Sequence, residues 1–190
     1  LNNVFDKVIK KRIYFWYKMM LQKVKPTSAS RRQLIKLNSK SLNISKKPLL
    51  KSKIAGKKNS SGRNNSGKIT EFHKGAGVKQ KYREINFNRK YNSTGIVCTI
   101  EHDPNRNAYI SSVFDFIDKT FYYILTPQNL RVGDIVKSGL KAAPTLGSSL
   151  PIANIPIGTP IHNIAPTLKS SAQISRSAGT FSIIKEKTEK

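Results

Sequence analysis

Apolar and polar residues alternate in five short runs in the middle of the chain. The runs are rich in β-branched and aromatic residues, and a period of two is typical of strands with one buried face. Residues that favour turns, namely Gly, Pro, Asn and Asp, separate the runs. The pattern predicts a mainly β protein with a small closed barrel of the OB type over residues 69–126. Its strands are expected at 69–73, 82–87, 96–101, 108–114 and 120–125.

A second set of strand patterns follows over residues 127–190. Strands are expected at 134–137, 161–164 and 180–184, and the segments between them are rich in Pro, Gly and Ala. Three strands do not close a barrel, and the charged run at 185–190 comes where further strands would be needed. We therefore expect a partial second barrel, with its missing strands supplied by another chain.

Residues 1–24 have the pattern of an amphipathic helix. Phe5, Ile9, Ile13 and Trp16 fall on one side at about 100° per residue, and lysines gather opposite. Lys18 interrupts the apolar stretch, which is far shorter than the roughly 20 residues that a membrane span needs. Docking on a neighbouring protein or RNA is the favoured role, and a mitochondrial targeting segment would look similar.

The basic residues are concentrated towards the N-terminus. Of 35 Lys and Arg residues, 19 lie in residues 1–70, where Asp6 is the only acidic residue, and the formal net charge is +25. Residues 96–168 contain five basic and five acidic residues. A self-repelling basic segment without apolar periodicity cannot bury enough surface to fold alone. Residues 25–68 are therefore expected to form an extended arm that a polyanion orders.

This polyanion is expected to be nucleic acid rather than an anionic membrane. Membrane binding requires a basic helix with a wide apolar face, whereas here Arg and Asn alternate with Gly in short loops. We call the densest stretch, SGRNNSGKITEFHKGAGVKQKYR, the clamp segment. Glycine allows a close backbone approach, while Arg, Lys and Asn donate hydrogen bonds to phosphate and sugar oxygens. The donors of the clamp segment are Arg63, Asn64, Asn65, Lys68, His73, Lys74, Lys79, Lys81 and Arg83.

Part of the clamp segment also matches the front of a nucleotide-binding P-loop. Gly62 and Gly67-Lys68 have the required spacing, but Ile69 stands where Ser or Thr would hold magnesium. The preceding residues are too polar for a buried strand, and the following ones have a strand pattern rather than a helical one. An NTPase is therefore disfavoured.

The remaining reactive residue types form no catalytic or metal-binding pattern. His73, His102 and His162 are far apart and have no Cys-x-x-Cys partner, and Cys98 is alone in an apolar strand pattern. The lone cysteine excludes a disulfide framework and indicates either a reducing compartment or a core position, of which the core position is favoured. We therefore expect no enzyme, no metal site and no cofactor, apart from magnesium or potassium ions that RNA itself would hold.

The aromatic run at the end of the first barrel allows two interpretations. Phe121 and Tyr123 share one face of the expected strand and Tyr122 points to the other. OB sheets use such aromatics to stack bases. We favour a core position for Phe121 and Tyr123, with base stacking as the alternative.

Several short runs resemble one known family in order and spacing. Together these runs resemble universal large-subunit ribosomal protein two over roughly residues 25–184. The resemblance begins with Lys25-Pro-Thr-Ser28 and Arg31-Arg32. Residues 1–24 lie outside this resemblance. The matching runs are Gly62-Arg-Asn-Asn-Ser-Gly-Lys-Ile-Thr70, Asp103-Pro-Asn-Arg106, Leu130-Arg-Val-Gly-Asp134, Asn154-Ile-Pro-Ile-Gly158, Ile161-His-Asn-Ile164 and Arg176-Ser-Ala-Gly-Thr180.

The resemblance implies an OB-like barrel, an SH3-like barrel and a long basic N-terminal extension. It also implies a structural protein that binds large-subunit rRNA near the peptidyl-transferase region, contacts neighbouring ribosomal proteins and supports subunit association. The alternative is a free-standing OB protein that binds single-stranded nucleic acid. The candidate RNA-binding residues are Lys25, Arg31, Arg32, Arg63, Asn64, Asn65, Lys68, His73, Lys74, Lys79, Lys81, Tyr82, Arg83, Arg89, Arg106, Arg176 and Ser177.

Two departures from the family pattern bear on partners and location. Gly75-Ala-Gly-Val78 replaces a glycine-rich loop with a second His, so one RNA contact is expected to be lost. The Gly- and His-rich C-terminal part of the family is missing, and we expect a second polypeptide to carry it. Heavy use of Lys, Asn and Ile favours an AT-rich organelle genome. The mitochondrial ribosome, in the matrix, is preferred over the plastid ribosome.

Overall fold

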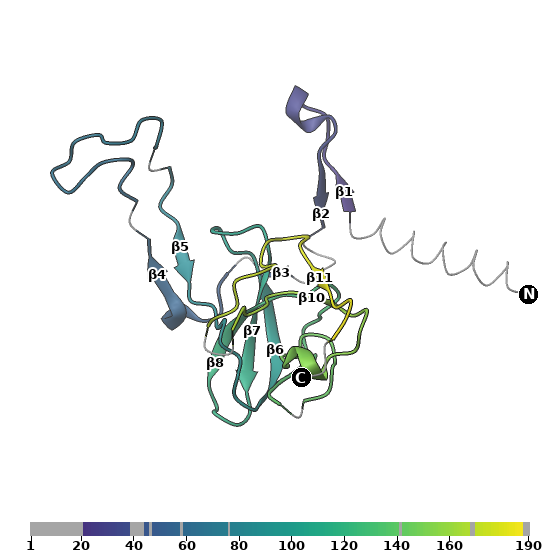
Figure 1. Cartoon of the computed structure of the whole chain (residues 1–190). Coiled ribbons are helices and arrows are strands. Elements are labelled where there is room, and N and C mark those ends of the chain that lie inside the picture. The colour runs from purple at the N-terminus through teal and green to yellow at the C-terminus, as the bar shows by residue number, and fades with distance from the viewer. Residues whose placement is uncertain are drawn as a thin grey trace, which may run out of the picture. The chain divides into compact units, whose positions relative to one another are not determined.

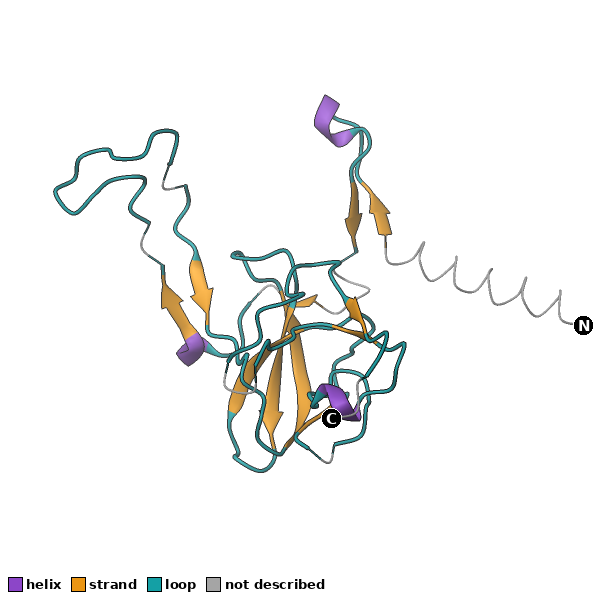
Figure 2. Cartoon of the chain, in the orientation of Figure 1, coloured by secondary structure: helices purple, strands orange, loops and turns teal. Residues whose placement is uncertain are grey.

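The protein is mainly β, as the alternation predicts (Figure 2). The chain divides into two compact units, Leu1–Ile44 and Ser45–Lys190. Within the described residues, helical structure is limited to three single turns of 3-10 helix, η1 (Ala29–Arg31), η2 (Lys51–Lys53) and η3 (Ile152–Asn154). The computed structural model describes residues 21–38, 44–45, 47–57, 59–75, 77–140, 142–167 and 170–187.

The first unit contains a short hairpin. Strand β1 (Leu21–Lys23) pairs antiparallel with β2 (Ile35–Leu37), and η1 lies in the connection. All six strand residues are exposed to solvent. Of the helix predicted over 1–24, residues 1–20 lie outside the described residues, and residues 21–23 form β1.

A five-stranded sheet forms the centre of the second unit, and its strands resemble an open barrel (Figure 1). Its longest strand, β6 (Ser93–Glu101), pairs antiparallel with β7 (Ile110–Asp115), which pairs with β8 (Phe121–Leu125). Strand β9 (Ile135–Ser138) pairs with β6, and β3 (Ile44–Ser45) is also adjacent to β6. The strands predicted at 96–101, 108–114 and 120–125 are confirmed. The strand at 134–137 was predicted to be the first of the second barrel. It is β9, and it belongs to this sheet instead.

Alternating apolar residues of these strands form the interior. Val97, Ile110, Val113, Tyr123 and Val136 are at most 1% exposed, because successive side chains of a strand point to opposite faces. Phe121, at the start of β8, is 42% exposed. The core prediction therefore holds for Tyr123 and is wrong for Phe121.

Strand β6 has two local irregularities that affect its packing on β7. The register with β7 shifts between Val97 and Thr99, and the half-buried Cys98 lies at this irregularity. Such bulges increase the local twist of a strand. At Gly95 an added Cβ would lie 2.6 Å from Val113 Cγ1 and 2.7 Å from the Phe114 carbonyl oxygen. Glycine thus allows β7 to approach β6 closely.

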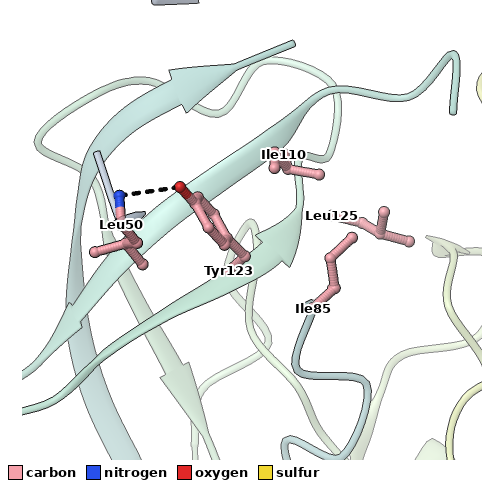
Figure 3. Close-up of a cluster of buried hydrophobic side chains, with 5 residues drawn as sticks. All are labelled: Leu50, Ile85, Ile110, Tyr123 and Leu125. Atoms are coloured by element: carbon pink, nitrogen blue, oxygen red, sulfur yellow. Dashed lines mark hydrogen bonds between the residues drawn. The ribbon is translucent and has the colours of Figure 1, made fainter. Parts of the chain in front are cut away.

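A buried cluster holds the segments on either side of the clamp against the sheet (Figure 3). Leu50, ahead of η2, and Ile85 pack with Ile110, Tyr123 and Leu125. The Leu50 N–H donates a hydrogen bond to the Tyr123 hydroxyl at 3.1 Å. Burial of such apolar side chains contributes about 2 kcal/mol each, so both ends of the intervening hairpin are anchored.

A hydrogen-bond network continues from Tyr123 into the sheet. The Tyr123 hydroxyl donates to Glu101 Oε2 at 3.0 Å, while Glu101 Oε1 accepts from the Leu49 N–H at 2.8 Å and from the Thr99 hydroxyl at 2.9 Å. Glu101 is 1% exposed. Burial raises the pKa of Tyr123 to about 12, the Leu50 N–H opposes this rise, and the Glu101 carboxylate adds to it. A buried carboxylate is stable here because each oxygen has partners.

The clamp segment lies on a hairpin made by β4 (Ile54–Gly56) and β5 (Lys81–Arg83), which pair antiparallel. The strand predicted at 82–87 is realised as β5 and a single bridge from Ile85 to Tyr123. The strand predicted at 69–73 is wrong. Ile69 is 54% and Phe72 is 76% exposed, and the N–H groups of Thr70 and Glu71 both bond to the Gly62 carbonyl. These bonds close a turn instead of a ladder.

Beyond β9 the described part of the second unit is largely irregular, and the SH3-like barrel expected there remains a prediction. Strands β10 (Pro160–Ile161) and β11 (Ser182–Ile183) form a two-stranded ladder, so the strands predicted at 161–164 and 180–184 exist but are short. Isolated bridges join Ser138 to Ser149 and Ile164 to Ile174.

Candidate nucleic-acid interface

A long loop, residues 57–80, joins β4 to β5 and carries most of the clamp segment (Figure 1). Its base is organised by the Gly62 carbonyl oxygen, which accepts from the Thr70 N–H at 2.9 Å, the Glu71 N–H at 3.1 Å and the Thr70 hydroxyl at 3.2 Å. Gly62 has a φ of +73°, and a Cβ there would collide with the Glu71 carbonyl. Glycine is required at this position.

Asn64 organises the tip of the loop through its side chain. Its Oδ1 accepts from the Ser66 N–H at 3.0 Å, the Ser66 hydroxyl at 2.8 Å and the Lys68 N–H at 2.9 Å. The side-chain oxygen is therefore used inside the loop. The contact of Asn64 with RNA remains a prediction, and it would have to use the amide nitrogen.

The loop presents cations that have almost no acidic partner. Glu71 is its only acidic residue, and it pairs with Lys74 at 2.6 Å, both side chains being more than half exposed. An exposed pair of this kind contributes little, so the loop keeps a strong positive charge. The exposed predicted residues of this loop and the adjoining strand are Arg63, Asn64, Asn65, Lys68, His73, Lys74, Lys79, Lys81 and Tyr82.

The local structure around Lys68 differs from that of a P-loop. A P-loop requires a helix directly after its lysine. Here a bridge joins Arg63 to Ile69, and a bend at 71 and a turn at 72–73 follow. This geometry removes the structural basis for the NTPase interpretation.

Two predicted RNA-binding arginines, the buried Arg83 and the partly exposed Arg106, meet at a buried carboxylate. Asp103 is fully buried and accepts from Arg106 Nε at 2.7 Å, while Arg83 Nη1 lies 3.8 Å away. Burial alone would raise the pKa of Asp103, but hydrogen bonds from the Asn105 backbone, Arg106 and the Asn105 side chain lower it overall. Arg83 is only 7% exposed. The structure thus gives Arg83 a structural contact, and its contact with RNA remains a prediction.

Arg89 also interacts with protein groups. Its Nη1 donates to the Gly147 carbonyl at 2.8 Å, and its own carbonyl accepts from the Ser149 hydroxyl at 3.0 Å. Burial lowers the pKa of Arg89, and burial together with the charge of Arg89 lowers the pKa of His162. These bonds join the segment after β5 to the irregular part after β9.

The last two predicted residues lie between β10 and β11. Arg176 and Ser177 are both exposed. The Arg176 guanidinium carbon lies 4.8 Å from the centroid of the Phe87 ring, and the Ser177 carbonyl accepts from the Thr180 hydroxyl at 2.7 Å. Arg106 also lies over Phe87, with its guanidinium carbon 5.9 Å from the centroid. The fold thus brings Arg106 and Arg176 to one ring.

The three predicted residues of the first unit are exposed around η1. Lys25, Arg31 and Arg32 lie in or near the connection between β1 and β2. Arg31 Nη1 donates to the Thr27 hydroxyl at 3.4 Å. Within the part of this unit that the structure describes, no ion pair neutralises them.

Sequence reasoning missed two aromatic residues of the interface. Phe72 is 76% exposed in the loop of cations, where a ring can stack on an unpaired base. The guanidinium groups of Arg106 and Arg176 lie over the ring of Phe87. An aromatic residue inside a basic, glycine-rich segment was the available signal for Phe72. No local signal marks Phe87, because its arginines are distant in sequence.

Other kinds of site find no support among the described residues. They contain no group of three or more His, Cys, Asp and Glu side chains arranged to hold a metal ion. In the same part of the chain, no helix has the length and apolar character to span a membrane.

Known proteins resemble this chain over most of its length. Residues 50–138 match the family described as ribosomal proteins L2, RNA-binding N-terminal domain. Large ribosomal subunit protein uL2m of Reclinomonas americana is 44% identical over 172 residues, which cover 90% of this chain and 61% of that protein.

Bacterial relatives are similar to the same degree. Large ribosomal subunit protein uL2 of Alcanivorax borkumensis is 44% identical over 165 residues, covering 85% of this chain and 58% of that protein. The uL2 of Parabacteroides distasonis is 43% identical over 172 residues, covering 89% and 61%. The chain thus spans about three fifths of the length of these curated relatives.

Proposed function

The chain belongs to the uL2 family of large-subunit ribosomal proteins, and we propose that it is a structural, non-enzymatic constituent of the large ribosomal subunit that binds rRNA. The observation that carries this proposal is the exposed set of cations on the β4–β5 loop, with Glu71 as the loop's only acidic residue. Cations without partners in the protein are stabilised by an external polyanion.

Binding is proposed to combine the loop with the exposed arginines of the first unit. Each neutralised phosphate releases counterions, so affinity falls with salt by a slope of about 0.9 per contact on a duplex and about 0.7 on a single strand. The buried sheet fixes the two ends of the loop through Leu50 and Ile85. A fixed base limits the conformations that the loop loses on binding, which favours recognition of one folded RNA shape.

The proposed position within the subunit follows from the family resemblance. We propose that the bound rRNA lies near the peptidyl-transferase region, that the protein contacts neighbouring ribosomal proteins, and that it supports association of the subunits. Chemical footprinting of large-subunit rRNA with and without the chain would test this position. Protection confined to other regions of the rRNA would contradict it.

A second polypeptide is proposed to complete the SH3-like part. Its ladder has only two strands, and nearby large apolar side chains are exposed, including Ile174 at 49%, Phe181 at 63% and Ile183 at 53%. A surface of this kind is typical of an uncovered interface. We propose that it receives the remaining part of the same family protein. Co-purified subunits in which no other polypeptide cross-links to β11 would argue against this.

The mitochondrial ribosome is the proposed location. Similarity to the mitochondrial uL2m supports it, although bacterial relatives are equally similar. The composition rich in Lys, Asn and Ile agrees with an AT-rich organelle genome. Immunodetection in purified mitochondria and plastids would decide between the two organelles.

Sedimentation tests the central proposal. The tagged chain should migrate with large-subunit particles at low salt and leave them only at high salt, because many phosphate contacts must be broken. As a control, the same chain should bind short single-stranded oligonucleotides weakly. Tight oligonucleotide binding without particle association would favour the free-standing single-strand binder instead.

A further inference from the structure

The end of β7, the start of β8 and the turn that joins them carry a cluster of exposed apolar side chains. Phe116 is 50% exposed, Ile117 is 61% exposed and Phe121 is 42% exposed. The centroid of the Phe114 ring lies 5.8 Å from that of Phe116, edge to face, and 4.8 Å from that of Phe121. We call Phe114, Phe116, Ile117 and Phe121 the aromatic patch.

Hydrogen bonds of the backbone hold the aromatic patch in one arrangement. The Phe116 N–H donates to the Thr94 carbonyl on β6 at 2.9 Å. The Ile117 N–H donates to Asp115 Oδ1 at 2.9 Å, and Asp115 is only 2% exposed. A surface that is already ordered loses little conformational freedom when a partner binds.

The charge near the aromatic patch differs from that of the rest of the chain. Residues 107–130 contain Asp115 and Asp118 but only one cation, Lys119, whereas the whole chain has a formal net charge of +25. Asp118 is exposed and forms no ion pair with any residue that the structure describes.

This charge pattern decides which kind of partner fits the aromatic patch. An RNA backbone would meet the Asp118 carboxylate here, and the high net charge of the chain opposes contact with a second copy. An exposed apolar surface with a polar rim is typical of a site for another protein. The carboxylate at the rim is complementary to a basic side chain of that protein.

Resting on the proposed function, we propose that the aromatic patch is the docking surface for one basic and apolar segment of a neighbouring ribosomal protein. An apolar side chain of that segment packs on Phe116, Ile117 and Phe121, and a Lys or Arg beside it pairs with Asp118. Packed aromatic side chains carry most of the binding energy of such an interface. The charge at its rim contributes to selectivity and to the rate of association.

Site-specific cross-linking in assembled particles identifies the occupant. The full chain, with the photoreactive residue p-benzoylphenylalanine in place of Phe116, is assembled into large-subunit particles and irradiated, and the attached peptide is sequenced by mass spectrometry. We expect one segment of another ribosomal protein in which a Lys or Arg lies beside an apolar residue. The same probe in place of Tyr91, which is 85% exposed outside the patch, should not capture that segment. Cross-links from position 116 to rRNA or to a second copy, or none at all, would overturn the docking site.

Binding of the captured segment, made as a synthetic peptide, measures the contribution of each side chain. Phe116→Ser and Ile117→Ser should each weaken its binding to the full chain about tenfold. Asp118→Lys should weaken it about threefold, and less at high salt. Tyr91→Ser, the matched control, should keep the affinity. Equal affinity of the wild type and all three patch variants would overturn the site.

Two further measurements make these results decisive. Urea denaturation checks that each variant is folded, and Ile117→Ser decides the question should Phe116→Ser fail to fold. The affinity for transcribed large-subunit rRNA should be the same for Ile117→Ser and the wild type. A loss of rRNA affinity in this folded variant would assign the patch to RNA and overturn the docking site, while rRNA binding itself would stand. A wild-type chain that does not join large-subunit particles would overturn the proposed function, and the docking site with it.

Discussion

The sheet of the second unit and the loop between β4 and β5 differ in how their charged groups are partnered. In the sheet, the carboxylates of Glu101 and Asp103 are buried and every oxygen is bonded to the chain itself. In the loop, Arg63, Lys68 and Lys79 face solvent and have no acidic partner among the described residues. The charges of the first region are neutralised within the protein, whereas we propose that those of the second are neutralised by a polyanion.

This difference separates stability from binding. A buried charge destabilises the protein strongly once its partner is removed, whereas exposed charges contribute little to folding. Substitutions in the sheet should therefore lower the free energy of unfolding, and substitutions in the loop should lower RNA affinity.

The largest effect is expected for Asp103→Ala. The substitution leaves the buried Arg83 guanidinium without a carboxylate and releases Arg106 and Asn105. We expect the free energy of unfolding to fall by about 3 kcal/mol, as measured by urea denaturation. Asp118→Ala, in the exposed turn between β7 and β8, is the matched control. Equal stability of the two variants would mean that the buried network does not hold the sheet.

A smaller loss of stability is expected for Tyr123→Phe. The ring still fills its place in the core, but the Leu50 N–H and Glu101 Oε2 lose their partner. Leaving buried polar groups unsatisfied costs about 2 kcal/mol, which a shift in the urea midpoint would register. Tyr91→Phe removes a hydroxyl from a side chain that is 85% exposed and should have no measurable effect. A neutral result for Tyr123→Phe would indicate that water replaces the hydroxyl.

Gly62→Ala should lower the affinity for RNA and leave the stability of the sheet unchanged. The new Cβ meets the Glu71 carbonyl at a positive φ, so the loop must rearrange at a cost of about 1 to 3 kcal/mol. RNA affinity should fall about tenfold, while the unfolding midpoint of the sheet stays unchanged. Gly75→Ala, where a Cβ meets no atom within 4 Å, should keep the affinity. Equal affinity of both variants would show that loop geometry is unimportant.

The smallest expected effect is a dependence of stability on pH. The pKa of Asp103 is lowered in the folded protein, so this carboxylate stabilises the fold above its unfolded pKa of about 4 and loses that contribution as the pH falls further. When the pH is lowered from about 5 to about 3, the free energy of unfolding should fall more for the wild type than for Asp103→Asn. Asp118→Asn should follow the wild type. Parallel curves of stability against pH for all three proteins would show that Asp103 does not contribute to the loss of stability in acid.

The strands of the barrel were predictable because burial imposes alternation on them. Residues 96–101, 108–114 and 120–125 alternate and form β6, β7 and β8. Strands β1 and β4 have no such signal, since their side chains are largely exposed and only pairing with a distant segment makes them strands. The strand expected at 69–73 had the pattern without the burial, so turn bonds to Gly62 prevailed.

The sequence was sufficient to predict which cationic residues belong to the candidate site, but not which of them are exposed and which contact other parts of the protein. The clamp segment carries its charge on the surface, where the predicted loop residues lie. Arg83 and Arg89 are chemically similar to Arg63, but they donate to or pair with protein groups. Little in the local sequence distinguishes the three arginines, because Asp103 and Gly147, with which Arg83 and Arg89 interact, are distant in sequence.

The amino-acid sequence by itself determined where positive charge accumulates and which segments have the period of a strand, since both properties depend on composition and on nearest neighbours. Only the tertiary structure decided which arginines meet a carboxylate, which face solvent, and that Arg106 and Arg176 share the ring of Phe87. Hydrogen bonds and ion pairs act over a few ångströms, and those separations exist only once distant segments have packed together.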